Sequence, residues 1–490
     1  MNKNMSLILL LVLLGGILFF SMPKWLYSGD PIAIRTSSVS LLNNGHLGVP
    51  FRDQKAIEKF FVEEGSYFIK NQQKLRYYPK WGPAGPLLYT IPFAFEKLLG
   101  GELNYLQATK HSVLLLNIFN LFIALALALY LYLLLGFVTH AFWPRAFTLL
   151  STFFATFLWH YLRAQSLELF QCFLFTAYVF HLFCYLQNEH KEKRHLFMAS
   201  VYTTILFLLK NYFLLLFPLA VLFLLLLASK EKKNRNKAIM HIGQYFILPT
   251  LIGAGLLALS NHIRFGAWSA SGYETNAHVY ANFTGNILYG LWGYLASPRY
   301  SIFTHFPILI FALMGIKIVF QKSRHIVLFL GLHFMTFVGL FSSLENWAGE
   351  WAYGPRLILF CLIPLSLFFC AFLENLNTLE QASFRNFALL GTLCVMLLSC
   401  FLQEKVNRFP FFISYLIEQR ISHYAQNTDL EPYFQKTSVP IMALELNAFK
   451  NQQKLFYPFI EMDGRESPQN MQRLSKAIEP LLKTNYYWSD

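Results

Sequence analysis

Charged residues are scarce in this sequence. Only 13% of the 490 residues are Asp, Glu, Lys or Arg, whereas soluble globular proteins carry about 25%. Hydrophobic residues make up 55% of the chain and include 51 Phe. Because a water-soluble core of this size cannot bury so much apolar surface, a soluble globular protein is excluded and a polytopic membrane protein is predicted.

Several chemical signatures are also missing. The six cysteines all lie within apolar runs, which excludes a disulfide framework or a zinc site made from loop cysteines. Neither of the glycine-rich motifs that bind nucleotide phosphates occurs, so nucleotide binding is not supported. No internal repeat is visible, which argues against a transporter built from two homologous halves.

The apolar residues fall into eleven runs. We therefore predict an all-α polytopic membrane protein with about 11 transmembrane helices, a long first extracytoplasmic loop with juxtamembrane helices, and a small C-terminal extracytoplasmic segment. Between two of the runs, Lys210 and Asn211 predict a tight outer-side turn, because a lone charge at the bilayer centre is costly. The runs are 7–20, 111–136, 146–162, 166–187, 196–209, 211–229, 242–260, 303–320, 326–343, 355–373 and 386–402.

The positive charge follows the expected topology. Forty Lys and Arg against 26 Asp and Glu give a net charge of +14, which in a soluble protein would indicate nucleic-acid binding. Here the basic loops 188–195 and 230–241 account for much of it, so no nucleic-acid partner is expected and the N-terminus is predicted to be cytoplasmic. The first loop, 23–110, is then extracytoplasmic. We divide the chain into a transmembrane domain, 1–402, and an extracytoplasmic segment, 403–490.

Asp30 lies in the first outer loop, just after the first apolar run, within the sequence Ser28-Gly29-Asp30-Pro31. A carboxylate at the membrane surface can accept a proton from an incoming hydroxyl or amine. The alternative is that Asp30 caps the helix that Pro31 opens. The two roles are compatible, because a cap fixes the side chain in place.

Three ionisable residues lie at the outer ends of predicted spans. Arg163 and Glu168 flank the turn between the third and fourth runs, and intramembrane ionisable residues are functional candidates. The alternative is an internal Arg–Glu pair that only holds two helices together. Lys210 either presents its ammonium to a lipid phosphate or extends to the surface without a further role.

The loop 345–356 contains two Trp, three Glu or Arg side chains and a Tyr close to the bilayer. Arg356 falls on the first turn of the next helix, where a guanidinium beside free N–H groups suits a phosphate. Glu350, Trp351 and Tyr353 precede it and are candidate substrate-binding residues. Trp and Tyr at this depth also occur as an interfacial belt, but the cluster is denser than a belt requires.

Taken in order, these motifs resemble the GT-C superfamily of integral-membrane glycosyltransferases, near the bacterial branch related to protein mannosyltransferases and the aminoarabinose transferase of lipid A. Each motif is weak alone, but the shared order is specific, and the resemblance covers about residues 1–375. The motifs are SGD (28–30), SSVSLLNNGHLGV, YYPKWGPAGPLLYTIPF, RAQSLE, the Lys at the end of the 196–209 run, NHIRFGAWSASGY, GLWGYLASPRYSIFTHFP and WAGEWAYGPR.

The resemblance implies a sugar donor carried on a polyprenyl phosphate, used at the outer face of a bacterial inner membrane. It implies that Asp30 is the catalytic base and Glu168 a second catalytic acid, and that Lys210 and Arg356 bind phosphate. Arg163, Tyr353, Glu350 and Trp351 are assigned to substrate binding. Many relatives carry Asp-Glu in the first loop, whereas Pro31 follows Asp30 here.

The acceptor class stays open between a glycan, a lipid and a protein. No cofactor is assigned; Asp30 and Glu168 are candidates to share a divalent cation, although they do not complete a ligand set. Two alternative functions use the same lipid-linked sugars. A transporter or flippase predicts charges near the midplane and paired broken helices, and a glycan ligase or polymerase typically has its long loop late in the chain.

Overall fold

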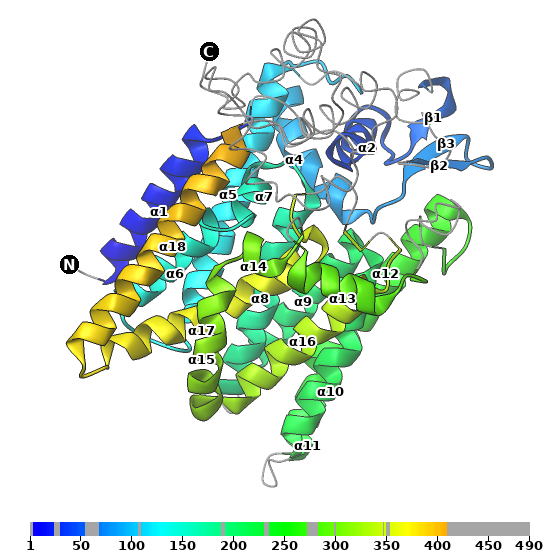
Figure 1. Ribbon diagram of the computed structural model, residues 1–490. Coiled ribbons are helices and arrows are strands. Elements are labelled where there is room, and N and C mark those ends of the chain that lie inside the picture. Colours follow the sequence, from blue (N-terminus) through cyan, green and yellow to red (C-terminus); the bar gives the residue numbers. More distant parts are fainter. Residues whose placement is uncertain are drawn as a thin grey trace, which may run out of the picture.

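The computed structural model describes a predominantly helical chain (Figure 1). The described residues are 3–23, 30–53, 68–105, 109–187, 192–229, 235–270, 272, 283–297, 300–345, 347–348 and 353–408. The first part of the chain forms α1 (Lys3–Phe20), α2 (Asp30–Asn44), β1 (Val49–Pro50), η1 (Phe51–Asp53), β2 (Phe68–Asn71), β3 (Arg76–Pro79), α4 (Ala84–Leu98), α5 (Lys110–Leu135), α6 (Phe142–Phe154), α7 (Leu158–Arg163), α8 (Leu167–Gln187) and α9 (Lys193–Leu209). The remainder forms η3 (Asn211–Leu215), α10 (Leu216–Ala228), α11 (Arg235–Ile242), η4 (Gly243–Ile247), α12 (Leu248–Phe265), α13 (Ile287–Ala296), α14 (Ile302–His305), α15 (Ile308–Lys322), α16 (Arg324–Ser342), η6 (Arg356–Ile358), α17 (Leu359–Asn377) and α18 (Ala382–Arg408).

Each of the eleven apolar runs coincides with helical structure. Seven helices within the described ranges are long and apolar enough to cross a membrane, which confirms a helical multi-pass membrane protein. The other four runs form α1, the broken pair α6 and α7, α9 and α15, which are shorter or interrupted. For these four, a full crossing stays a prediction.

The core lies around α8 and α17, the two most deeply buried of the long apolar helices. Helix α8 packs against α5, α9 and α17, and α17 also packs against α6 and α15. Buried aromatic side chains fill this interface; the rings of Phe175 and Phe360, for example, meet edge to face with centroids 5.1 Å apart. Residues at the start of α8 and of α17 are therefore held by a tightly packed interior.

The first loop folds into a compact layer on one end of the bundle, at the top of Figure 1. It contains α2, α4 and a three-stranded antiparallel sheet in the order β1-β3-β2. The first loop thus contains helices, and their position beside the membrane stays a prediction. The all-α expectation omitted the sheet, because its strands are only two to four residues long. We call this end of the bundle the α2–α4 end.

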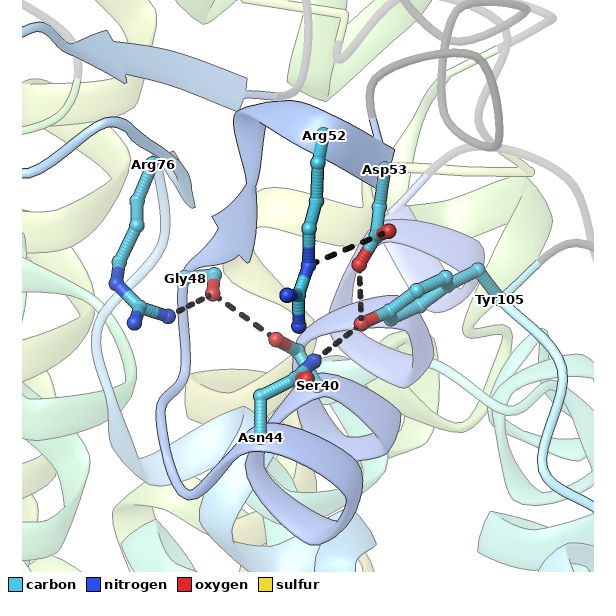
Figure 2. A network of polar contacts seen from close by, with 7 residues as sticks. All are labelled: Ser40, Asn44, Gly48, Arg52, Asp53, Arg76 and Tyr105. Carbon is cyan, nitrogen blue, oxygen red and sulfur yellow. Dashed lines mark hydrogen bonds and ion pairs between the residues drawn. The ribbon is translucent and has the colours of Figure 1, made fainter.

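A polar network fixes the C-terminal half of α2 to the sheet and to the segment before α5 (Figure 2). The Ser40 hydroxyl donates to the Gly48 carbonyl at 2.9 Å, and the Asn44 amide donates to the Tyr105 hydroxyl. The Tyr105 carbonyl in turn accepts from the Arg35 guanidinium at 2.9 Å. Burial raises the pKa of the Tyr105 phenol, so the hydroxyl remains available to donate to Asp53. These contacts set the direction of α2, whose first residue is Asp30.

Candidate functional site

A buried ion pair lies between the start of α8 and the end of α9. The Nζ atom of Lys210 is 3.6 Å from Oε1 of Glu168, and the two side chains are only 8% and 5% exposed. Helix α9 ends at Leu209, and Lys210 has extended backbone angles before η3 begins, so the predicted break is present. Each of these buried charges compensates the other, because an unpaired charge at the same place would lower the stability of the folded protein.

Arg356 adds a second cation to this pair. It is half-buried at the start of η6, which continues into α17, and it interacts electrostatically with Glu168 and with the Tyr161 phenol. One carboxylate thus lies among two cations, and the cluster carries excess positive charge. The structure brings together three of the residues that the sequence nominated, from three segments that are far apart in the chain.

A glycine in the first loop makes the position of Lys210 possible. The N–H of Gly82 donates to the Leu209 carbonyl at 3.1 Å. A methyl group on Gly82 would lie 1.9 Å from the Leu208 carbonyl oxygen, so no larger residue fits without moving the backbone. The WGP segment of the first loop, which contains Gly82, therefore packs against the last residues of α9.

Arg264, at the end of α12, fastens the same segment from the other side. Its guanidinium, which is 3% exposed, donates to the Trp81 carbonyl at 2.6 Å and to Asn261 Oδ1 at 2.9 Å. The motif NHIRFG thus binds the motif YYPKWGP, although the two motifs are far apart in the chain. The sequence did not nominate Arg264, and a lone Arg shortly after the apolar run 242–260 was the signal that could have found it.

Arg163 is held by backbone and amide groups at the ends of two other helices. Its Nη1 atom donates to the backbone carbonyl of Asn407 at 2.7 Å and to the Oδ1 atom of Asn407 at 2.8 Å, and its Nε atom donates to the Ser21 carbonyl. The ion pair of Glu168 is with Lys210, so the Arg163–Glu168 pair considered from the sequence is replaced by a different one. Arg163 ties the ends of α1 and α18 to α7.

Tyr353 is fully buried at the edge of the cluster. Its hydroxyl donates to Gln403 Oε1 at 2.6 Å, and its carbonyl accepts from the Tyr161 hydroxyl at 2.8 Å. Burial raises the pKa of the Tyr353 phenol, so it remains a donor. Gly354, which has a φ of +63°, turns the chain directly afterwards towards Arg356. Tyr353 therefore positions the segment that carries Arg356.

Three nominated residues lie wholly or partly outside the described structure. Glu350 and Trp351 fall outside the described residues, and Asp30 is described only as the first residue of α2. Among the residues described, no group of three or more His, Cys, Asp or Glu side chains could hold a metal ion.

Two site residues that the sequence did not nominate come from the last two turns of α18. Gln403 and Asn407 bind Tyr353 and Arg163, and both are almost completely buried. They lie beyond residue 402, where the apolar run ends, but α18 continues to Arg408. Polar residues at helical spacing after an apolar run were the signal that could have found them.

No protein-family model and no curated protein matches the chain. Solved structures do match. The oligosaccharyltransferase AglB from Archaeoglobus fulgidus, in complex with an inhibitory peptide and a dolichol-phosphate, is similar with a TM-score of 0.54 and 12% identity. That match covers 88% of this chain and 60% of the archaeal one, so this chain spans about three fifths of the archaeal enzyme's length.

ArnT from Cupriavidus metallidurans, bound to undecaprenyl phosphate, matches with a TM-score of 0.51 and 12% identity, covering 89% of this chain and 74% of that one. Its apo form gives a TM-score of 0.52 and 11% identity, with 92% and 69% covered. At such low identity the likeness shows the fold. The chain shares the fold of these two proteins, which agrees with the fold that the resemblance of the motifs implied.

Proposed function

We propose that the protein is a membrane glycosyltransferase that moves a sugar from a polyprenyl-phosphate donor to an acceptor at the extracytoplasmic face. The observation that carries the proposal is the buried Glu168–Lys210 ion pair at the α2–α4 end, with the half-buried Arg356 interacting with Glu168. The similar proteins were solved with dolichol-phosphate and with undecaprenyl phosphate, which supports a lipid phosphate as the ligand class.

The charge of the cluster suits a lipid phosphate. Two cations face one carboxylate, so the site lacks one negative charge, which an entering phosphate would supply. Lys binds phosphate as a point charge, and the Arg fork binds two oxygens at once. The surrounding helices are apolar, so the lipid tail can remain in the bilayer while its headgroup reaches the cluster.

The reaction follows from these assignments. The acceptor oxygen attacks the anomeric carbon, the bond from that carbon to the phosphate oxygen breaks, and the polyprenyl phosphate leaves with the electron pair. Lys210 and Arg356 stabilise the charge that develops on the leaving phosphate, which is the largest catalytic contribution in such a site. Asp30 takes the acceptor proton. A single direct displacement inverts the configuration at the sugar.

Glu168 holds Lys210 in place before the donor binds. When the phosphate arrives, Lys210 can exchange part of its interaction with the carboxylate for one with the phosphate, and Arg356 compensates Glu168. Glu168 is thus proposed as the second acid of the site, which orders the cations and does not attack the sugar.

A deletion strain tests the proposal. Lipid extracts from it should accumulate one polyprenyl-phosphate sugar, and the purified wild-type protein should consume that sugar lipid when membranes of the deletion strain are added as the source of the acceptor. Asp30→Asn should lower turnover by a factor of roughly 100 to 10,000, the usual contribution of a general base, with thermal unfolding unchanged. An extract identical to that of the parent strain would refute the proposal, and normal turnover by Asp30→Asn would remove the base assignment.

The same extracts separate the alternatives. A flippase defect also accumulates sugar lipid, but on the cytoplasmic leaflet, and purified wild-type protein would then not cleave the donor in detergent. A polymerase or ligase would consume the lipid-linked glycan only when a growing polymer or a lipid-anchored core is added. Inversion at the transferred sugar, measured by NMR of the product, supports the direct displacement.

A further inference from the structure

A buried glutamine borders the ion pair from inside the bundle. Gln171 is 1% exposed and lies three residues after Glu168 on α8, and residues at this spacing share one face of a helix. Because α8 begins at Leu167, Glu168 lies on its first turn and Gln171 lies about one turn further from the α2–α4 end. Gln171 therefore lies on the inner side of the Glu168–Lys210 ion pair.

A tyrosine joins Gln171 to Lys210. Tyr212 lies in η3, two residues after Lys210, and its hydroxyl donates to Gln171 Oε1 at 2.9 Å. The Nζ atom of Lys210 is 6.0 Å from the centroid of the Tyr212 ring and 3.6 Å from Glu168 Oε1. Two residues of α8 thus pair with two residues of the break after α9, and the four side chains form one network.

The amide nitrogen of Gln171 has no hydrogen-bond partner among the described residues. The bond from Tyr212 engages only the amide oxygen, whereas Nε2 carries two N–H donors. A buried donor without an acceptor lowers the stability of the folded protein, and such groups are rare enough in native proteins to require an explanation. The network therefore holds one donor that the described fold does not use.

An aromatic wall lies on one side of this network. The Tyr212 ring packs edge to face against Phe341, with centroids 4.9 Å apart, and against Phe213 with centroids 4.6 Å apart. Phenylalanine rings offer no oxygen that could accept from the amide. The charged neighbours of Gln171 belong to the cluster on the other side, so a ligand that enters the cluster comes next to the unpaired nitrogen.

The chemistry of the unpaired group selects its partner. A phosphate oxygen only accepts hydrogen bonds, whereas an ammonium group only donates and an alkyl chain does neither. A sugar hydroxyl can also accept, but in a lipid-linked sugar the phosphate lies between the sugar and the tail. Since Gln171 lies on the inner side of the ion pair, towards the bilayer, the phosphate is the group that reaches it.

We propose that Gln171 Nε2 is a third hydrogen-bond donor for the lipid phosphate headgroup, beside Lys210 and Arg356, and that Tyr212 holds the amide with this nitrogen turned to the headgroup. The inference rests on the proposed function, since it takes the ligand of the cluster to be a lipid phosphate. Gln171 is assigned as a substrate-binding residue and Tyr212 as a positioning residue.

The test measures the affinity of the purified protein in detergent for undecaprenyl phosphate, which carries the headgroup without a sugar. Gln171→Met keeps the length of the side chain and removes the amide. It should raise the Kd about 10- to 100-fold, as expected for the loss of a hydrogen bond to a charged group. Gln171→Glu should raise the Kd further, because its carboxylate adds a negative charge beside the phosphate.

The same variants separate binding from structure. Gln171→Glu retains an acceptor oxygen for the Tyr212 hydroxyl, so it would rescue a merely structural role. Tyr212→Phe removes the bond that orients the amide and should raise the Kd less than Gln171→Met. Tyr178→Phe is the matched control, because Tyr178 lies two turns further along α8 and shares a buried hydrogen bond of 3.1 Å with His333. It should lower the unfolding temperature but change the Kd by no more than a factor of about two, as for a distant site.

Each outcome decides the matter. Wild-type affinity in Gln171→Met would overturn the inference; lower turnover of the sugar lipid by that variant would then assign the amide to a sugar hydroxyl, and unchanged turnover would assign it to a resident water. Wild-type affinity in Gln171→Glu would limit Gln171 to holding Tyr212 and would also overturn the inference. If the wild-type protein does not bind undecaprenyl phosphate, the proposed function itself fails, and that result is read before any variant is compared.

Discussion

Replacing the carboxylate of Glu168 is the sharpest perturbation that the structure offers. In Glu168→Gln, Lys210 and Arg356 lose a carboxylate that interacts with both, and the Lys210 side chain is only 8% exposed. Removing one partner of a buried pair typically costs about 3–5 kcal/mol of stability, because the other charge stays buried. We expect the free energy of unfolding to fall by an amount in this range.

The presence of Arg356 makes the two single variants unequal. In Lys210→Met, Glu168 keeps Arg356 as a compensating cation, so the loss should be smaller than in Glu168→Gln. The double variant should be more stable than the sum of the single effects implies, with a coupling energy of about 0.5–3 kcal/mol. An undecaprenyl phosphate headgroup should stabilise Glu168→Gln more than the wild type, because it replaces the missing negative charge.

The assay is denaturant unfolding of the four purified proteins in detergent, with and without undecaprenyl phosphate. Glu192→Gln is the matched control. The Glu192–Arg194 pair is short, 2.7 Å, but its side chains are 37% and 76% exposed, so the change should stay within about 1 kcal/mol. Two results would refute the coupling of Glu168 to both cations. One is strictly additive changes in the free energy of unfolding, and the other is a larger loss of stability in Lys210→Met than in Glu168→Gln.

Other predictions concern the segments that position the cluster. Gly82→Ala should lower the free energy of unfolding by about 1–3 kcal/mol, because its methyl group would lie 1.9 Å from a backbone oxygen. Gly16→Ala on α1 is the control, because its methyl group would meet nothing within 4 Å, and chemical denaturation should show no loss of stability for it. Arg264→Leu removes the hydrogen bond from the Arg264 guanidinium to the Trp81 carbonyl, so limited proteolysis should cut the first loop faster than in wild type. An unchanged cleavage rate would show that this hydrogen bond does not hold the loop on α12. Tyr353→Phe leaves the Gln403 oxygen without its donor and should cost about 1–3 kcal/mol, and equal unfolding curves would show that the bond contributes nothing.

The predictions from sequence succeeded where the physics is local. A run of about 20 apolar residues must form a helix in a bilayer, since each backbone group needs a partner, and all eleven runs are helical. The break at Lys210 was predicted for a comparable reason, because a charge does not sit inside an apolar helix without compensation. The number of full crossings was less predictable, since α6 and α7 divide one run.

The predictions failed or stayed open where partners are distant in the chain. Nothing in the local sequence distinguishes Arg163 from Lys210 as the partner of Glu168, because the choice depends on how α8 and α9 pack. The small sheet was missed because strands of two to four residues carry no periodic signal. The role of Asn407, 244 residues from Arg163, has no sequence signal beyond its helical spacing.

The sequence by itself determined that this protein crosses a membrane many times and that its charged residues gather in loops and at helix ends. The reason is that solvation acts on each segment separately: apolar runs enter the bilayer, and charges avoid it. Tertiary structure alone decided which charges meet. Glu168 faces Lys210 and Arg356, and Arg163 binds Asn407, because packing of distant helices determines which buried polar groups find partners.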